Sequence, residues 1–140
     1  MGATSGIGME VAKLLAAKGW QVGIAGRRTE RLQALMTDGI ACYQQIDVTS
    51  ADAPHLLQQL IDKLGGMDLY FHSSGIGWQN NQLDIEKELK TVETNGMGFT
   101  RMVDTAFNWF AAHTTKTENK HTSRIACITS IAGTKGLGAA

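Results

Sequence analysis

The stretch Gly2-Ala3-Thr4-Ser5-Gly6-Ile7-Gly8 constrains this fold more than any other, because it runs directly into an amphipathic helical pattern. Its glycines suit three roles: Gly2 permits a tight turn, Gly6 lets the backbone approach a phosphate, and Gly8 lets a helix pack closely on a sheet. The first N–H groups of the helix and the positive end of its dipole attract an anion. The stretch therefore predicts a turn that binds the pyrophosphate of a nucleotide. A glycine-rich turn that only caps a helix is the alternative, since the chain has 16 glycines.

Helical and strand-like patterns alternate along the chain. The helical patterns cover residues 7–18, 27–36, 50 or 51 to 64, and about 85–112, the last interrupted at residues 95–98. The strand-like runs are residues 20–25, 40–46, 67–72 and 124–130, and residues 78–82 and 113–123 are predicted loops. In the first helix, Ile7, Val11, Leu14 and Leu15 form the predicted apolar stripe. This alternation predicts βαβ units and a parallel sheet with right-handed crossovers.

Length and charge limit the range of functions. The 140 residues correspond to one domain, and 13 Lys and Arg balance 13 Asp and Glu. Without a basic cluster we expect no nucleic acid partner, and without an apolar run of spanning length we expect no membrane partner. Cys42 and Cys127 lie in apolar runs, which favours buried thiols and a reducing, cytoplasmic compartment. The four histidines lack metal-ligand spacing, so we expect no metal site.

Several landmarks follow one another in an order that resembles the short-chain dehydrogenase/reductase family over the whole chain. The glycine stretch is similar to the family's T-G-x-x-x-G-x-G, with Met1 in place of the threonine. Asp47-Val48 matches the pair that the family places against adenine, and Asn95 matches its active-site asparagine. Ile128-Thr129-Ser130-Ile131-Ala132-Gly133 is similar to its I-S-S-x-A-G segment. The resemblance implies a doubly wound parallel sheet of the Rossmann type, in three α/β/α layers.

The sequence departs from the family's pattern at three places. His72-Ser73-Ser74-Gly75 replaces the family's N-N-A-G, although Ser73 can still bond nearby backbone. Only Met1 remains of the apolar strand that precedes the glycines in the family, and this strand is central in the order 3-2-1-4-5-6. The family's Y-x-x-x-K is also absent, because no tyrosine follows Tyr70. We therefore expect residues 1–140 to be one domain of a longer protein, without its first strand and its C-terminal part.

The resemblance implies hydride transfer between a nicotinamide and a carbonyl or alcohol carbon of a small molecule. In the family a tyrosine donates the proton, a lysine lowers its pKa, a serine positions the substrate oxygen and an asparagine anchors a water. Ser130 and Asn95 match this set and are the catalytic candidates. A serine that caps a turn and an Asn-Gly break in a helix are the alternatives. The other functional interpretation is a non-catalytic nucleotide-binding or regulatory domain.

The residues after the first strand-like run bear on the cofactor. NAD-specific members of the family have a carboxylate there, whereas this chain has Gly26 followed by Arg27 and Arg28. Because a guanidinium binds phosphate in bidentate fashion, Arg27 favours NADP(H) over NAD(H). A solvated basic turn partnered by Glu30 is the alternative. The expected cofactor-binding residues are Gly2, Thr4, Ser5, Gly6, Ile7, Gly8, Arg27, Arg28, Asp47, Val48, Ser74 and Gly75.

The last helical pattern carries a broad apolar face, made of Phe99, Met102, Val103, Ala106, Phe107 and Phe110. Such a face is wider than one side of a sheet needs. The resembled family often builds dimers and tetramers with this helix, so we expect a homodimer or homotetramer.

Overall fold

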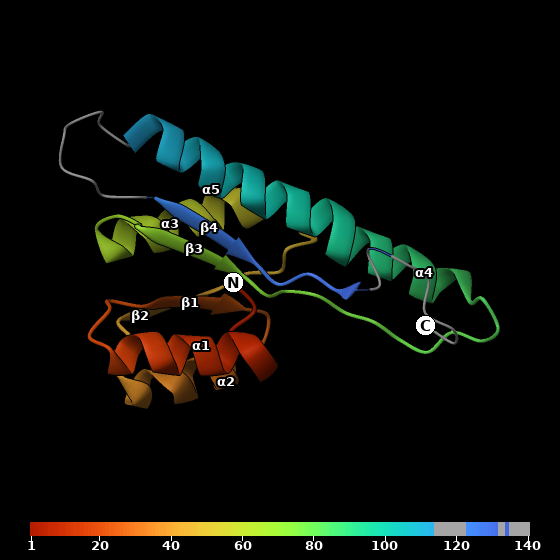
Figure 1. The fold of residues 1–140 in the computed structure, drawn as a ribbon, viewed down its shortest axis with the longest axis horizontal. Coiled ribbons are helices and arrows are strands. Elements are labelled where there is room, and N and C mark those ends of the chain that lie inside the picture. The colour runs from red at the N-terminus through yellow and green to blue at the C-terminus, as the bar shows by residue number, and fades with distance from the viewer. Residues whose placement is uncertain (114–122, 132–133, 135–140) are drawn as a thin grey trace.

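Parallel strands in two separate pairs form the centre of the fold (Figure 1). The computed structural model describes residues 1–113, 123–131 and 134. β1 (Gly23–Gly26) pairs with β2 (Cys42–Gln45), and β3 (Leu69–His72) pairs with β4 (Arg124–Cys127), both in parallel. The predicted α/β class with parallel strands is confirmed. The described strands do not form one continuous sheet, because β1 and β3 share no ladder.

Helices cover both faces of the strands, as three layers require. α1 (Gly6–Ala17) and α2 (Thr29–Leu35) lie on one side of β1, and α3 (Ala53–Leu64) and α5 (Phe99–His113) lie with the other strands (Figure 1). Ile24 of β1 belongs to the core with α1 and α2, whereas the next residue, Ala25, belongs to the core with α3 and α5. Successive side chains of a strand point to opposite faces, so β1 is buried from both sides.

The long helix predicted over about residues 85–112 has no break at residues 95–98, where the sequence predicts an interruption. α4 (Ile85–Val92) passes into α5 through η2 (Glu93–Gly98), a π-helical turn that contains Asn95. π turns accommodate an extra residue without ending the helix, and they occur often at functional sites. Between α2 and β2 lies a short 3₁₀ turn, η1 (Met36–Asp38). Among the described helices, none has both the length and the apolarity to span a bilayer.

Two local predictions need correction. Each described strand has four residues, fewer than its predicted run, because only these residues find a ladder partner. The predicted stripe on α1 is wrong at two of its four residues, since Ile7 and Leu14 are 57% and 60% exposed, whereas Val11 and Leu15 are half-buried. The buried residues of α1 are Gly8 and Ala12, whose small size lets the helix approach the strands closely. Residues 114–122 of the predicted polar loop lie outside the described residues.

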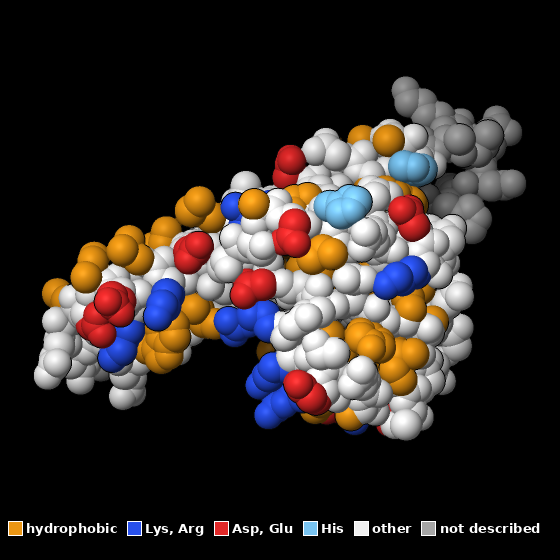
Figure 2. Space-filling model, turned by 180° about the vertical axis from the view of Figure 1, so that it is seen from behind, with side chains coloured by type: hydrophobic (Ala, Val, Ile, Leu, Met, Phe, Trp, Pro, Cys, Tyr) orange, Lys and Arg blue, Asp and Glu red, His pale blue; other side chains and the backbone are white. Residues whose placement is uncertain are grey.

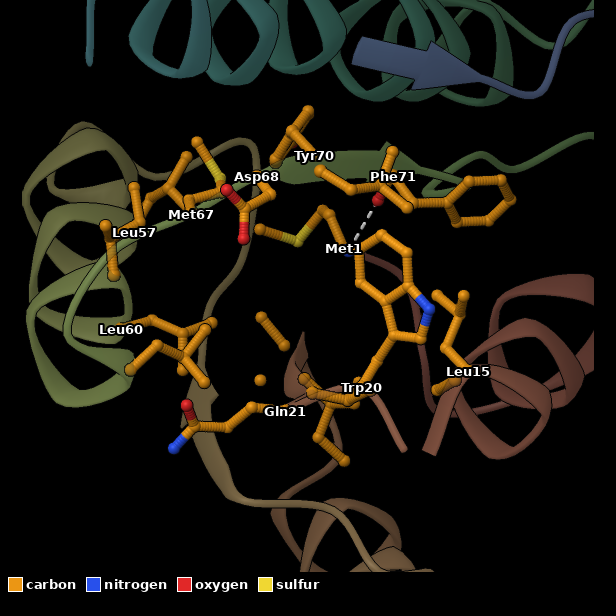
Figure 3. A pocket seen from close by; sticks show the side chains of 18 of the residues that line it. Met1, Leu15, Trp20, Gln21, Leu57, Leu60, Met67, Asp68, Tyr70 and Phe71 are labelled. Atoms are coloured by element: carbon orange, nitrogen blue, oxygen red, sulfur yellow. Dashed lines mark hydrogen bonds between the residues drawn. The ribbon is translucent and has the colours of Figure 1, made fainter. Parts of the chain in front are cut away.

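A groove of about 720 Å³ separates β1 from β3 (Figure 3). Apolar side chains of α1 and α3 line it, including Leu15, Leu57 and Leu60. Met1 lies at one end, where its backbone amine donates to Phe71 O at 2.8 Å and its carbonyl accepts from Ser73 N at 3.1 Å. The next residue bonds the other strand pair, because Gly2 N donates to Ala25 O at 2.9 Å.

Candidate functional site

The glycine stretch forms a tight turn that packs against the segment after β3. Gly2 has φ +83°, and a Cβ on it would lie 2.6 Å from Ser74 N. A Cβ on Gly8 would overlap Ser73 Oγ and the Gly2 carbonyl. Ser73 Oγ donates to Met1 O at 3.0 Å, which is the backbone bond expected of a serine at this position. The turn, the start of α1 and the loop after β3 are therefore held together without room for side chains at Gly2 and Gly8.

The start of α1 leaves backbone donors available to a ligand. Ser5, the N-cap residue, makes no side-chain capping bond. Gly6 has φ +57° and open space where a Cβ would stand, and Ile7 is exposed. Uncapped N–H groups at the positive end of a helix dipole favour an anion. This geometry suits the pyrophosphate position assigned to Ser5, Gly6 and Ile7.

Two basic residues, Arg28 and Arg31, contact the glycine turn. Arg28 bonds two hydroxyls of the turn. Its Nη2 donates to Thr4 Oγ1 at 2.9 Å and to Ser5 Oγ at 2.8 Å. Arg31, which the sequence reasoning missed, donates from Nη1 to Thr4 O at 3.3 Å. Arg27 is exposed and contributes its carbonyl, which accepts from Gln45 Nε2 at 3.0 Å. Arg28 and Arg31 therefore bond the turn, and the role predicted for Arg27 at a 2′-phosphate stays a prediction. The three-residue spacing from Arg28 to Arg31 is a signal that could have found Arg31.

Gly26 is required by the close approach of Thr4. A Cβ on Gly26 would lie 2.7 Å from Thr4 Cγ2. Thr4 is 7% exposed, so its side chain has little room to move. The absence of a carboxylate at this strand end therefore has a steric cause, in addition to the charge argument that a carboxylate would repel a 2′-phosphate.

The Asp47-Val48 pair forms a turn directly after β2. Asp47 Oδ1 accepts from Thr49 N at 3.0 Å and from Thr49 Oγ1 at 2.8 Å. Val48 is 4% exposed, and its carbonyl accepts from Arg101 Nη1 of α5 at 2.8 Å. The turn is therefore rigid, and it stands at the carboxyl end of its strand, where ligands bind in open α/β sheets.

Asn95 holds the loop that follows β3. Ile76 N donates to Asn95 Oδ1 at 2.9 Å, and Asn95 Nδ2 donates to Ile76 O at 2.7 Å. A Cβ on Gly75 would lie 3.5 Å from the same Oδ1. Both ends of the amide are engaged with backbone, so this side chain fixes the loop containing Ser74 and Gly75.

Ser130 follows the carboxyl end of β4, beside the loop that follows β3. His72 pairs with Cys127 at the ends of β3 and β4, and Ile128 N donates to His72 O at 2.9 Å. The chain after β4 therefore follows the chain after β3 (Figure 1). Ser130, three residues past Cys127, is exposed. The structure brings the predicted residues to the carboxyl ends of the strands, although in sequence they span residues 2–130.

Comparison with known proteins decides the family. The family model described as short chain dehydrogenase matches residues 1–140. This chain belongs to the short-chain dehydrogenase family. An uncharacterized oxidoreductase of Myxococcus xanthus is 32% identical over 142 residues, which cover 97% of this chain and 54% of that protein. The chain spans about half the length of the curated relatives it matches first.

Solved structures of other short-chain dehydrogenases share the fold. Serine dehydrogenase from Escherichia coli superposes with a TM-score of 0.84 at 23% identity, over 99% of this chain and 63% of that one. The F189W actinorhodin polyketide ketoreductase, solved with NADPH, superposes with a TM-score of 0.81 at 28% identity, over 99% of this chain and 54% of that one. The Rossmann-type fold predicted for this chain is thereby confirmed.

A buried histidine, His72, is a residue of this short-chain dehydrogenase that departs from the family pattern. His72, where the family has an asparagine, is 1% exposed, and its Nδ1 lies 2.9 Å from Tyr70 Oη. Burial is the largest cause that lowers the pKa of His72 to about 4, against a smaller opposing effect of the Ser74 backbone. Burial raises the pKa of Tyr70. Tyr70 and His72 are therefore both neutral, and the hydrogen bond between them braces β3 internally.

Proposed function

We propose that the whole protein is an NADP(H)-dependent oxidoreductase that interconverts a carbonyl and an alcohol of a small molecule by hydride transfer. One observation carries this proposal: the guanidinium of Arg28 donates hydrogen bonds to the hydroxyls of Thr4 and Ser5 in the glycine turn. The relatives named oxidoreductases, and the ketoreductase solved with NADPH, support it. The two free thiols, Cys42 and Cys127, support a cytoplasmic location.

Each end of the cofactor has residues suited to it. Backbone N–H groups at the start of α1 would hold the pyrophosphate, and Arg28 would bind the 2′-phosphate with Arg27 nearby. Asp47 and Val48 would border the adenine, as the family resemblance implies. The bound nicotinamide supplies or accepts the hydride. Ser130 would donate a hydrogen bond to the substrate oxygen, while Asn95 keeps the loop of Ser74 and Gly75 in place.

Replacing Arg28 tests the cofactor preference. In the full-length gene product, Arg28→Ala should weaken NADPH binding about tenfold while changing NADH binding little, because only NADPH carries the phosphate. Fluorescence titration with both cofactors measures this ratio. Arg124→Ala, which removes an exposed guanidinium at the opposite end of β4, is the control and should leave both affinities unchanged. An unaltered NADPH/NADH ratio in Arg28→Ala would end the assignment.

We also propose that the protein is a homodimer or homotetramer built on α4. The predicted apolar face on α5 is partly core, since Met102, Ala106 and Phe110 are buried. Phe107 of that face is 60% exposed. Other exposed apolar side chains gather at the projecting end of the molecule that contains α4 (Figure 2), and those on α4 are Ile85, Leu89 and Val92, each more than half exposed. Unpartnered apolar surface of this kind marks interaction sites.

Sedimentation tests this assembly. At micromolar concentration the full-length gene product should sediment with a mass of at least two chains, and Leu89→Glu should shift it toward one chain by placing a charge on the apolar face. Lys90→Glu, on the neighbouring position, is the control for charge alone and should keep the larger mass. A single-chain mass for the unsubstituted protein contradicts the proposal.

The groove between β1 and β3 supports one more proposal about the organisation of the protein. An extended apolar segment would fit between the two strands, bond both free edges and end at Met1, whose neighbours already bond both sides. Such a segment would join the two strand pairs into one sheet with the order of the family.

A further inference from the structure

Arg101 makes a contact that joins the two ends of the candidate site. It lies in the first turn of α5, and its Nη1 donates to Val48 O at 2.8 Å across 53 residues of sequence. Within the described residues Arg101 forms no ion pair. We propose that Arg101 is a positioning residue for the adenosine end of the cofactor, acting through the turn of Asp47, Val48 and Thr49; this inference rests on the proposed function.

The turn is held against the helix by two contacts of different kinds. Gly98, at the end of η2, faces Val48 so closely that a Cβ on it would lie 2.7 Å from Val48 Cγ2 and 3.1 Å from Val48 O. That contact fixes the distance between the turn and the helix, but it does not fix the orientation of the peptide that carries the Val48 carbonyl. The guanidinium of Arg101 fixes this orientation, because a charge-assisted hydrogen bond is directional and strong.

The bonds inside the turn depend on that peptide orientation. Asp47 Oδ1 accepts two bonds from Thr49, and Asp47 O accepts from Ser50 N at 3.1 Å. Val48 O has Arg101 as its donor. Removal of the guanidinium would leave this half-buried carbonyl without that donor, which favours rotation of the Val48 peptide. The Val48 carbonyl shares its peptide with the N–H of Thr49, which donates to Asp47 Oδ1. Rotation of that peptide would weaken this bond, and the carboxylate of Asp47 would lose its fixed direction toward a ligand.

The same short helical segment also fixes the other end of the site. Asn95 bonds the Ile76 backbone, and Arg101, six residues later, bonds Val48. The loop after β3 and the turn after β2 are thus attached to one rigid element. Since each attachment has its own side chain, loss of Arg101 should disturb adenosine binding and leave the reaction centre unchanged.

The experiment compares Arg101→Met with Arg101→Lys in the full-length gene product. Methionine keeps the apolar stem and removes the donor, whereas lysine retains a charged donor. We expect Arg101→Met to weaken NADPH, NADH and adenosine 2′,5′-bisphosphate by the same factor of about 3–10. The kcat at saturating cofactor and the NADPH/NADH ratio should stay within about twofold of their original values, and Arg101→Lys should recover most of the affinity.

Three outcomes separate this inference from the function beneath it. If the unsubstituted protein binds none of the three ligands, the proposed function fails. If it binds them and Arg101→Met binds them equally well, Arg101 has no positioning role. If kcat falls together with affinity, or Arg101→Lys shows no recovery, Arg101 supports the fold generally and the inference is overturned. Circular dichroism melting of both variants identifies a folding defect, and in that case the lysine variant alone decides.

Discussion

Gly8→Ala is expected to lower the free energy of unfolding by about 3 kcal/mol, a large loss for one methyl group. The added Cβ would overlap Ser73 Oγ and the Gly2 carbonyl. A flexible side chain could rotate away, but the carbonyl belongs to the turn itself. The first turn of α1 must therefore separate from the loop after β3. Denaturant unfolding monitored by circular dichroism measures the change.

A second helical glycine provides the matched control. Gly96 in η2 has no neighbouring atom within 4 Å of the position that a Cβ would take, so Gly96→Ala meets no steric conflict. Alanine loses less conformational entropy on folding than glycine, and the variant should be as stable as the original or slightly more stable. Equal stability of Gly8→Ala and Gly96→Ala would show that α1 does not pack on the turn as described.

Ser130→Ala should lower kcat of the full-length gene product by roughly 10²–10³ and leave NADPH affinity nearly unchanged. A hydroxyl that donates to the substrate oxygen acts mainly when negative charge develops there, so its loss raises the barrier and not the dissociation constant. Ser130 is exposed after β4, whereas Arg28 and Asp47 follow β1 and β2 of the other strand pair. Steady-state carbonyl reduction and cofactor titration separate the two effects.

Thr129→Ala is the control for this serine. Thr129 carries the neighbouring hydroxyl and is also exposed, but it has no assigned role in the site. Turnover within about threefold of the original is expected for it, since most surface substitutions have small effects. Undiminished turnover in Ser130→Ala would remove Ser130 from the mechanism.

The order of elements could be predicted from the sequence, because period and turn residues are local properties. The face that α1 buries could not. Ile7 and Leu14 follow helical spacing, yet the closest approach to the strands is made by Gly8 and Ala12, since small residues let backbones meet. Hydrophobic periodicity counts large side chains and overlooks such a contact.

The candidate site shows the same limit. A basic pair after β1 was evident as a pattern, but which arginine reaches the turn depends on where α2 begins, at Thr29. Arg28 directly precedes the helix and points back to Thr4, whereas Arg27 does not. The bond between Arg101 and Val48 joins residues too far apart for any local pattern, and only the packing of η2 against the turn reveals it.

The free edges of β1 and β3 also affect how the isolated chain should behave during expression and purification. Unpaired N–H and C=O groups along a strand are templates for pairing with other chains, and folded proteins usually protect them. Here β1 and β3 face one groove, which apolar side chains of α1 and α3 line in part, so an extended segment of a second molecule could be bound from both sides. We predict that residues 1–140 produced alone undergo strand exchange and aggregate, and that a short apolar peptide supplied during refolding competes for the groove and keeps the molecules apart.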